Sequence, residues 1–386
     1  MRYSVLSQAT LLVIGLIVPI GVPAVMGLDY YGRFVALTAS AFLIQRLADF
    51  PAETLIFEGD RRRLLLRSAA LQSTFMAMAA VVSSWTSVRI ELLFLMGLQC
   101  SSVAFSLVLS CRSDRLTLAY LATFLAAYLA ALLYALGSGS SLAWAIAVPN
   151  FLALLWIPWA LRAPMLVDAA AAPGQGRRLH IPVLDVALRV AAGSFVAFAT
   201  LGLAVIATTD RAVDTAQIRL LGTALGFSAF LLPWPMKSLV GILQAAQLPA
   251  LLRLLRYLRG TQWLALVLIG LAIGVPATSR LALCAGLSLV FLNYLVVERW
   301  NIAQGSMAGL ARIALLATVA ALAAFKLIST SADPVARASV SILTGCALYA
   351  VLSWKALPTQ SAGRTLAAEL SWVSIACAAA LVWSQR

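Results

Sequence analysis

The feature that most constrains this chain is a succession of apolar runs, each about 20 residues long, separated by short polar or basic stretches. A helix of that length crosses the roughly 30 Å hydrocarbon core of a bilayer. Of the 386 residues 62% are hydrophobic and only 11% are charged, whereas about a quarter of a soluble domain is charged. The chain is therefore predicted to be an all-α integral membrane protein, and a soluble globular domain is excluded.

The apolar runs predict about thirteen membrane-spanning helices. We expect them at about residues 5–27, 33–57, 64–86, 91–111, 116–136, 141–162, 185–208, 218–248, 261–278, 281–297, 308–328, 337–354 and 366–384. Whether the last run crosses the membrane stays open at this point.

Basic residues predict the topology, because loops on the cytoplasmic side carry an excess of Lys and Arg. With a cytoplasmic N-terminus, the clusters at 61–63, 177–178 and 253–259 all face the cytoplasm, and the opposite loops carry only isolated arginines. The formal net charge of +14 is thus explained by topology, and no nucleic-acid partner is expected. We predict a multi-pass membrane protein with its N-terminus in the cytoplasm; a bacterial inner membrane is implied only by the family resemblance given below.

The polar stretch 163–182, rich in Ala, Pro and Gly, divides the chain nearly in half. We predict an N-terminal helical lobe at 1–165, a cytoplasmic linker at 166–182, a C-terminal helical lobe at 183–356 and an additional C-terminal helix at 365–386. The second and eighth spans each combine a proline with charge and end in an arginine cluster, so Pro51 and Pro235 can be superposed. This predicts two pseudo-symmetric six-helix lobes around a central cavity. The alternative is that apolar helices resemble one another without a repeat.

Charged side chains within the second span are the strongest functional signal. Arg46, Asp49 and Glu53 lie at i, i+3 and i+7 and share one helix face. Each charge costs about 2.5–3.5 kcal/mol at the bilayer centre, so this face should look into the bundle or a water-filled cavity. A self-neutralising cluster of ion pairs that joins two helices would also explain it.

Two further cations lie in apolar spans, Lys237 in the eighth and Arg189 in the seventh. We take Arg46, Lys237 and Arg189 as candidate substrate-binding cations, and Asp49 and Glu53 as candidate ion-coupling groups or charge partners. Arg189 and Arg67 lie near cytoplasmic helix ends, where snorkelling to the headgroups competes with this role. Tryptophans near span ends are predicted interface anchors; these are Trp85, Trp144, Trp156, Trp159 and Trp300.

Sequence motifs for catalysis are absent. The chain contains no DxD, GxSxG, HExxH or Walker A sequence, and its five cysteines lack metal-ligand spacing. We therefore expect no catalytic residue, no cofactor and no metal, and we predict that the protein is not an enzyme.

The segment GLDYYGRFVAL (27–37), followed by an apolar helix and an arginine cluster, resembles the G-x-x-x-YG opening of polysaccharide flippases of the Wzx type. These belong to the multidrug/oligosaccharidyl-lipid/polysaccharide (MOP) exporter superfamily. The stretch 212–256 is similar to the opening of a second lobe, although Gln217-Ile218 replaces its tyrosine-glycine step.

The resemblance implies a two-lobed transporter that moves a polyprenyl-diphosphate-linked oligosaccharide between leaflets by alternating access. Its product would enter O-antigen, capsule or exopolysaccharide, with membrane lipids, a proton or sodium ion and a polysaccharide polymerase as candidate partners. One alternative is a cation-coupled exporter of small molecules or drugs from the same superfamily. Another is a membrane-embedded polysaccharide polymerase.

Overall fold

The computed structural model describes residues 2–55, 61–85, 91–111, 113–139, 141–164, 183–207, 211–231, 248–274, 279–304, 307–328, 333–357 and 361–384. Within these ranges every regular element is a helix and no β-strand occurs, which confirms the all-α prediction. Two compact units divide the chain, and each is described by itself. Unit 1 is Met1–Val190 with Thr208–Ala216, and unit 2 is Ala191–Ala207 with Gln217–Arg386.

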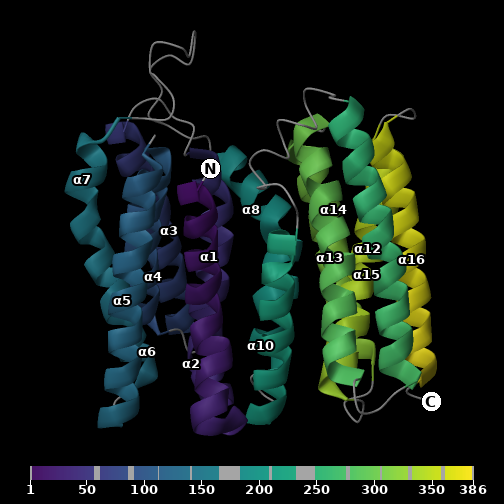
Figure 1. Ribbon diagram of the computed structural model, residues 1–386, viewed down its shortest axis with the longest axis horizontal. Coiled ribbons are helices and arrows are strands. Elements are labelled where there is room, and N and C mark those ends of the chain that lie inside the picture. Colours follow the sequence, from purple (N-terminus) through teal and green to yellow (C-terminus); the bar gives the residue numbers. More distant parts are fainter. Residues whose placement is uncertain are drawn as a thin grey trace. The chain divides into compact units, whose positions relative to one another are not determined.

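Unit 1 is a bundle of long, roughly parallel and antiparallel helices (Figure 1). Its elements are α1 (Arg2–Leu16), η1 (Ile17–Gly21), α2 (Val22–Leu55), α3 (Arg61–Trp85), α4 (Leu92–Ser110), α5 (Asp114–Ser138), α6 (Leu142–Leu152), η2 (Ala153–Trp156) and α7 (Ile157–Arg162), with the beginnings of α8 and α10. Its largest described core cluster joins α3, α4, α5 and α7, where Tyr120 stacks on Phe105 and meets Trp156 edge-on.

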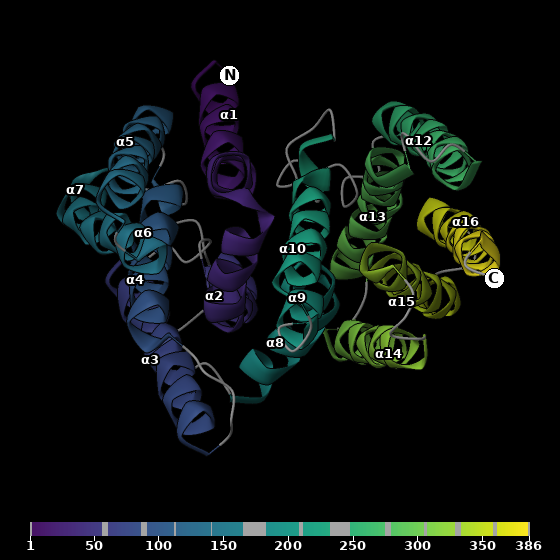
Figure 2. The same cartoon turned by 90° about the horizontal axis from the view of Figure 1, so that it is seen from below.

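Unit 2 is a second helical bundle, seen along its helices in Figure 2. Its elements are the rest of α8 (Val183–Ala197), η4 (Phe198–Gly202), α9 (Leu203–Ile206), the rest of α10 (Ala212–Phe227), η6 (Ser228–Leu231), α12 (Leu248–Gly274), α13 (Ser279–Gln304), α14 (Met307–Leu327), α15 (Pro334–Ala356) and α16 (Ala362–Ser384). At its centre the rings of Phe195, Tyr294 and Tyr349 pack together, with Tyr294 and Tyr349 centroids 4.7 Å apart. Gly345 makes room for Phe195, because a Cβ there would lie 2.1 Å from the ring.

Ten helical segments in the described ranges are long and apolar enough to cross a membrane, as expected of a multi-pass membrane protein. The first, Ala9–Ala48, has 40 residues, about twice what one crossing needs. Gly27 breaks it, with φ 84° and ψ 163°. It therefore provides two of the predicted spans.

The three motif residues of the G-x-x-x-YG opening have distinct structural roles in unit 1. Gly27 adopts a positive φ that side-chain-bearing residues rarely tolerate. Tyr31 is fully buried. Gly32 touches the start of α10, since a Cβ would lie 1.8 Å from the backbone oxygen of Ala212. The motif thus describes a helix break followed by a close helix crossing.

Most predicted spans coincide with helices to within a few residues. The ninth prediction, 261–278, is wrong at its start, because α12 begins at Leu248 and includes the arginine cluster 253–259. The tenth prediction, 281–297, ends too early, because α13 continues to Gln304.

The sixth predicted span is interrupted by the 3₁₀ segment η2 after Pro149, whose ring removes a helix hydrogen bond. The eighth was predicted at 218–248, but its helix begins earlier, at Ala212. Residues 232–247 of that span, including Pro235 and Lys237, lie outside the described ranges.

Two π-helices occupy matching places in the first helix of each half of the sequence. η1 follows the 15-residue helix α1, and η4 follows the 15-residue part of the seventh span that forms α8. Each has five residues and ends at a glycine, Gly21 or Gly202. Because π-helices are rare, this coincidence supports an internal repeat more strongly than apolar character alone does.

The tryptophans divide into two groups. Trp85, Trp144 and Trp159 are exposed, as interface anchors must be, and Trp156 is half-buried. The prediction is wrong for Trp300, which is buried against α16. A Cβ at Gly363 would lie 2.6 Å from the Trp300 ring, so the indole fills the space that a glycine leaves between α13 and α16.

Candidate functional site

Three helices of unit 1 meet where the strongest sequence signal was predicted. Ala48 on α2 and Leu71 and Phe75 on α3 form a buried apolar cluster. Ile44 and Leu47 from α2 and Val186 and Val190 from α8 pack against it. The cluster joins α2, α3 and α8 into one junction, which we call the α2–α3–α8 junction.

An arginine lies on each of these helices close to the cluster. Arg46 directly precedes Leu47, Arg189 directly precedes Val190, and Arg67 lies one turn before Leu71. All three arginines are half-buried. Arg67 and Arg189 each lie six residues after the start of their helix, and Arg46 lies nine residues before the end of α2. At 1.5 Å per residue these are depths of about 9–14 Å.

That common depth has an electrostatic consequence. Three half-buried arginines on three apolar helices add positive charge to this part of unit 1, in surroundings where charge is screened less than in water. Arginine does not deprotonate in proteins, so the charge is permanent. Each of the three side chains also has a polar or electrostatic interaction in the structure.

Uncharged polar side chains add hydrogen-bonding capacity near the junction. Gln45 on α2 and Ser68 and Gln72 on α3 are buried. Gln72 donates from Nε2 to the Ser102 hydroxyl on α4, at 3.2 Å. Its own Oε1, like the Ser68 hydroxyl, is buried without a hydrogen-bond partner among the described atoms. Such orphaned acceptors are costly in an apolar setting, which is a common property of sites that bind a ligand or water.

The sequence-predicted site residues are placed as follows. Arg46 lies on α2 and Arg189 on α8, two helices that pack together at the α2–α3–α8 junction, and Asp49 and Glu53 belong to α2. The side chains of Asp49 and Glu53, and all of Lys237, lie outside what the structure describes. Their roles as charge partners or substrate cation stay predictions.

Arg67, Gln45, Ser68 and Gln72 were not chosen as site residues from the sequence. Arg67, like Arg189, was predicted to snorkel to the headgroups, and no uncharged polar side chain was predicted to belong to the site. A signal was available, because Ser68 directly follows Arg67 and Gln72 lies four residues after Ser68, so that Ser68 and Gln72 share one face of α3.

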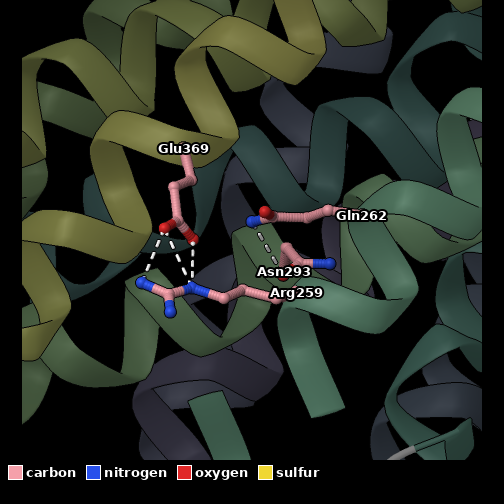
Figure 3. Close-up of polar contacts among 4 residues, drawn as sticks. All are labelled: Arg259, Gln262, Asn293 and Glu369. Carbon is pink, nitrogen blue, oxygen red and sulfur yellow. Dashed lines mark hydrogen bonds and ion pairs between the residues drawn. The ribbon is translucent and has the colours of Figure 1, made fainter. Parts of the chain in front are cut away.

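Unit 2 buries a polar network of its own. Gln262 on α12 donates to the Asn293 side-chain oxygen on α13 at 3.2 Å (Figure 3), and Asn293 donates to the Thr261 hydroxyl at 3.0 Å. Near the end of α13, the Tyr294 hydroxyl donates to the Glu298 carboxylate at 3.2 Å. Glu298 is only 1% exposed. The apolar run predicts a span that ends at residue 297, which would put the Glu298 carboxylate in a loop, whereas α13 continues to Gln304.

Nothing in the described part of the chain gathers three or more His, Cys, Asp or Glu side chains into a metal site. The helices of the α2–α3–α8 junction instead carry arginine, amide and hydroxyl side chains. Such side chains suit an anion, because arginine makes bidentate hydrogen bonds to phosphate and carboxylate. Comparison of the chain with protein-family models, with curated proteins and with solved structures finds no match.

Proposed function

We propose that the protein is a flippase that moves a polyprenyl-diphosphate-linked oligosaccharide from the cytoplasmic to the periplasmic leaflet of a bacterial inner membrane. The observation that supports this proposal is that Arg46, Arg67 and Arg189 are half-buried on the three helices that meet at the α2–α3–α8 junction. A diphosphate must lose much of its hydration to enter a helix bundle, and fixed guanidinium groups compensate for that loss. Buried cations of this kind generally mark a substrate path.

The proposed architecture is a pair of related six-helix lobes around a central cavity, with a further C-terminal helix. Support comes from the matching π-helices η1 and η4, each at the end of a 15-residue helix in the first span of its half. Transporters built from repeats bind their substrates between them near the middle of the membrane. The proposed arrangement predicts that Lys237 of the second half faces the cations of the first.

Asp49 and Glu53 complete the proposed mechanism. When no substrate is bound, these carboxylates neutralise the arginines of the junction. When a diphosphate enters, it replaces them as the counter-charge, and a proton or sodium ion is then accommodated by the carboxylates. Binding of substrate and of coupling ion are thus linked through shared arginines.

Export in living cells tests the proposal. A strain that lacks the protein should accumulate lipid-linked oligosaccharide on the cytoplasmic leaflet and lose surface polysaccharide. Arg46→Ala and Lys237→Ala should fail to restore export although they insert normally into the membrane. The matched control is Arg33→Ala, which removes an exposed arginine paired with Asp29 on the same helix. Normal export by both Arg46→Ala and Lys237→Ala would refute the role of these cations.

The two alternatives predict different results in the same strains. A cation-coupled drug exporter would confer resistance on overexpression, and Asp49→Asn would abolish it while surface polysaccharide persists. A membrane-embedded polymerase would lengthen lipid-linked sugars in a purified mixture. The cationic junction favours the flippase, because neutral or cationic drugs gain nothing from three arginines.

A further inference from the structure

Helix α12 presents an exposed basic face in its first three turns. Arg253, Arg256 and Arg259 are spaced three residues apart, and all are exposed. From Gly260 to Gly274 the same helix carries no charged residue. The arginines therefore lie at the boundary between a polar and an apolar length of one helix.

Below the arginines the same side of α12 continues as an exposed apolar strip. Trp263 is 71% exposed and lies four residues after Arg259, about 6 Å further along the axis. Leu264, Val267 and Leu271 follow, and each is about half exposed. Their spacing places them within one face of about 140° together with the arginines. This order of cations, then an aromatic ring, then aliphatic side chains matches the order of phosphate, interface and acyl chain in a lipid leaflet.

Helix α16 lies beside α12 and carries a parallel surface. Arg259 forms a bidentate ion pair with Glu369 of α16, with Nη2–Oε1 at 2.8 Å and Nε–Oε2 at 3.2 Å (Figure 3). Trp372, one turn after Glu369, is 73% exposed. Each residue of the ion pair is thus followed, within about one turn of its own helix, by an exposed tryptophan.

We propose that this α12–α16 surface is a binding site for an anionic phospholipid. The phosphodiester would be held by Arg253 and Arg256, with Trp263 and Trp372 at the level of the glycerol backbone and one acyl chain along Leu264, Val267 and Leu271. Arginine suits a phosphate because its donors match two phosphate oxygens. Charge complementarity selects an anionic lipid over a zwitterionic one, since α12 contributes three arginines to this surface and the one carboxylate described there, that of Glu369, pairs with Arg259.

The surface belongs to unit 2, whereas the α2–α3–α8 junction belongs to unit 1. The inference is therefore independent of the proposed transport of a lipid-linked sugar. It concerns a lipid that remains bound at the outside of the bundle.

The test is a titration of the full-length protein, in neutral detergent micelles, with fluorescent phosphatidylglycerol. The double variant Arg253→Gln/Arg256→Gln should bind about 30-fold more weakly than wild type, because each basic residue near anionic lipid contributes about fivefold. The control double variant, Arg33→Gln/Arg280→Gln, removes the same charge from exposed arginines elsewhere and should bind as wild type. Phosphatidylcholine should compete poorly against all of them.

A third variant gives an effect of opposite sign. Glu369→Gln removes the carboxylate that neutralises Arg259, so binding of phosphatidylglycerol should become about fivefold tighter. A change in folding could weaken binding but would not produce this increase. Equal losses in both double variants would show diffuse attraction to a protein of high net charge and overturn the proposal. Unchanged binding in Arg253→Gln/Arg256→Gln, or phosphatidylcholine binding as tightly, would overturn it as well.

Discussion

Arg219 on α10 donates a hydrogen bond from Nη1 to the backbone oxygen of Thr200, 3.2 Å away, within the π-helix η4. The wider turn of a π-helix disturbs the regular ladder of backbone hydrogen bonds, and Arg219 supplies an additional donor there. Gly222, three residues further along α10, lies against the same carbonyl group. The seventh and eighth spans are therefore held together at the π-helix by the hydrogen bond of Arg219 and by the close backbone approach that Gly222 permits.

Adding a methyl group at this crossing should be costly. A Cβ at Gly222 would lie 2.1 Å from the Thr200 backbone oxygen, and backbone cannot rotate away as a side chain can. We expect Gly222→Ala to lower the free energy of unfolding by about 1–3 kcal/mol, measured by thermal or denaturant unfolding in detergent. Gly226→Ala is the matched control on the same helix, because nothing lies within 4 Å of its Cβ.

The control should move in the other direction. Alanine is a better helix former than glycine by about 1 kcal/mol, so Gly226→Ala should leave stability unchanged or raise it. If the two variants unfolded at the same temperature, the close packing of α10 on η4 would be wrong.

The buried amide pair of unit 2 gives a second stability prediction. Asn293→Ala removes the acceptor of Gln262 and the donor to Thr261. The Gln262 amide then loses its described acceptor, while the Thr261 hydroxyl keeps its hydrogen bond to the Leu258 carbonyl. Leaving the buried amide donor without a partner should cost about 1–3 kcal/mol, visible as a lower unfolding midpoint. Thr74→Ala is a suitable comparison, since that hydroxyl is exposed and bonds only within its own helix; it should change stability little.

Topology can be tested at the break in the first apolar segment. Asp29 is exposed and lies two residues after Gly27. With a cytoplasmic N-terminus, we expect Asp29 to lie outside the cell. Asp29→Cys should react with a membrane-impermeant maleimide added to intact cells, whereas Arg61→Cys should react only after the cells are opened. The unmodified protein, with its five native cysteines, measures the background. Protection of Asp29→Cys in intact cells would mean that 9–48 does not form two crossings with its turn outside.

The C-terminus provides a separate topological test. Thirteen crossings from a cytoplasmic N-terminus put Arg386 outside, so alkaline phosphatase fused after it should be active and a fluorescent protein there should be dark. A fusion within 166–182 should give the reverse pattern. An active phosphatase in the linker would contradict the assignment of that stretch to the cytoplasm.

Several features of this structure could be predicted from sequence, and particular residues show why. Apolar length alone located the helices, because the backbone of a lipid-facing segment must satisfy its own hydrogen bonds. It could not separate η1 or η4 from the α-helices around them, since IVPIG and FATLG are as apolar as their neighbours. Nor could it show that Gly32 meets Ala212, a contact between residues 180 positions apart.

The candidate site was anticipated only in its charged part. Arg46 was predicted as a site residue because a cation in an apolar helix is energetically costly. Arg189 and Arg67 both lie near helix ends, where a side chain can snorkel to the headgroups at little cost, and of these two only Arg189 was predicted as a site residue. The packing of Leu71 beside Leu47 and Val190 shows that the helix of Arg67 meets those of the other two. Glu298 was missed because the arginine that follows it made VVERW resemble the start of a loop.

Transport by the purified protein is the decisive test of whether it moves a polyprenyl-diphosphate-linked oligosaccharide between leaflets. In liposomes loaded with fluorescent polyprenyl-diphosphate oligosaccharide, wild type should move the lipid between leaflets, as measured by its accessibility to an added quencher. Arg46→Gln and Arg189→Gln should each reduce the initial rate about tenfold or more, whereas Arg33→Gln should retain it. Failure of the wild-type protein to move this lipid, or wild-type rates in both Arg46→Gln and Arg189→Gln, would contradict the account.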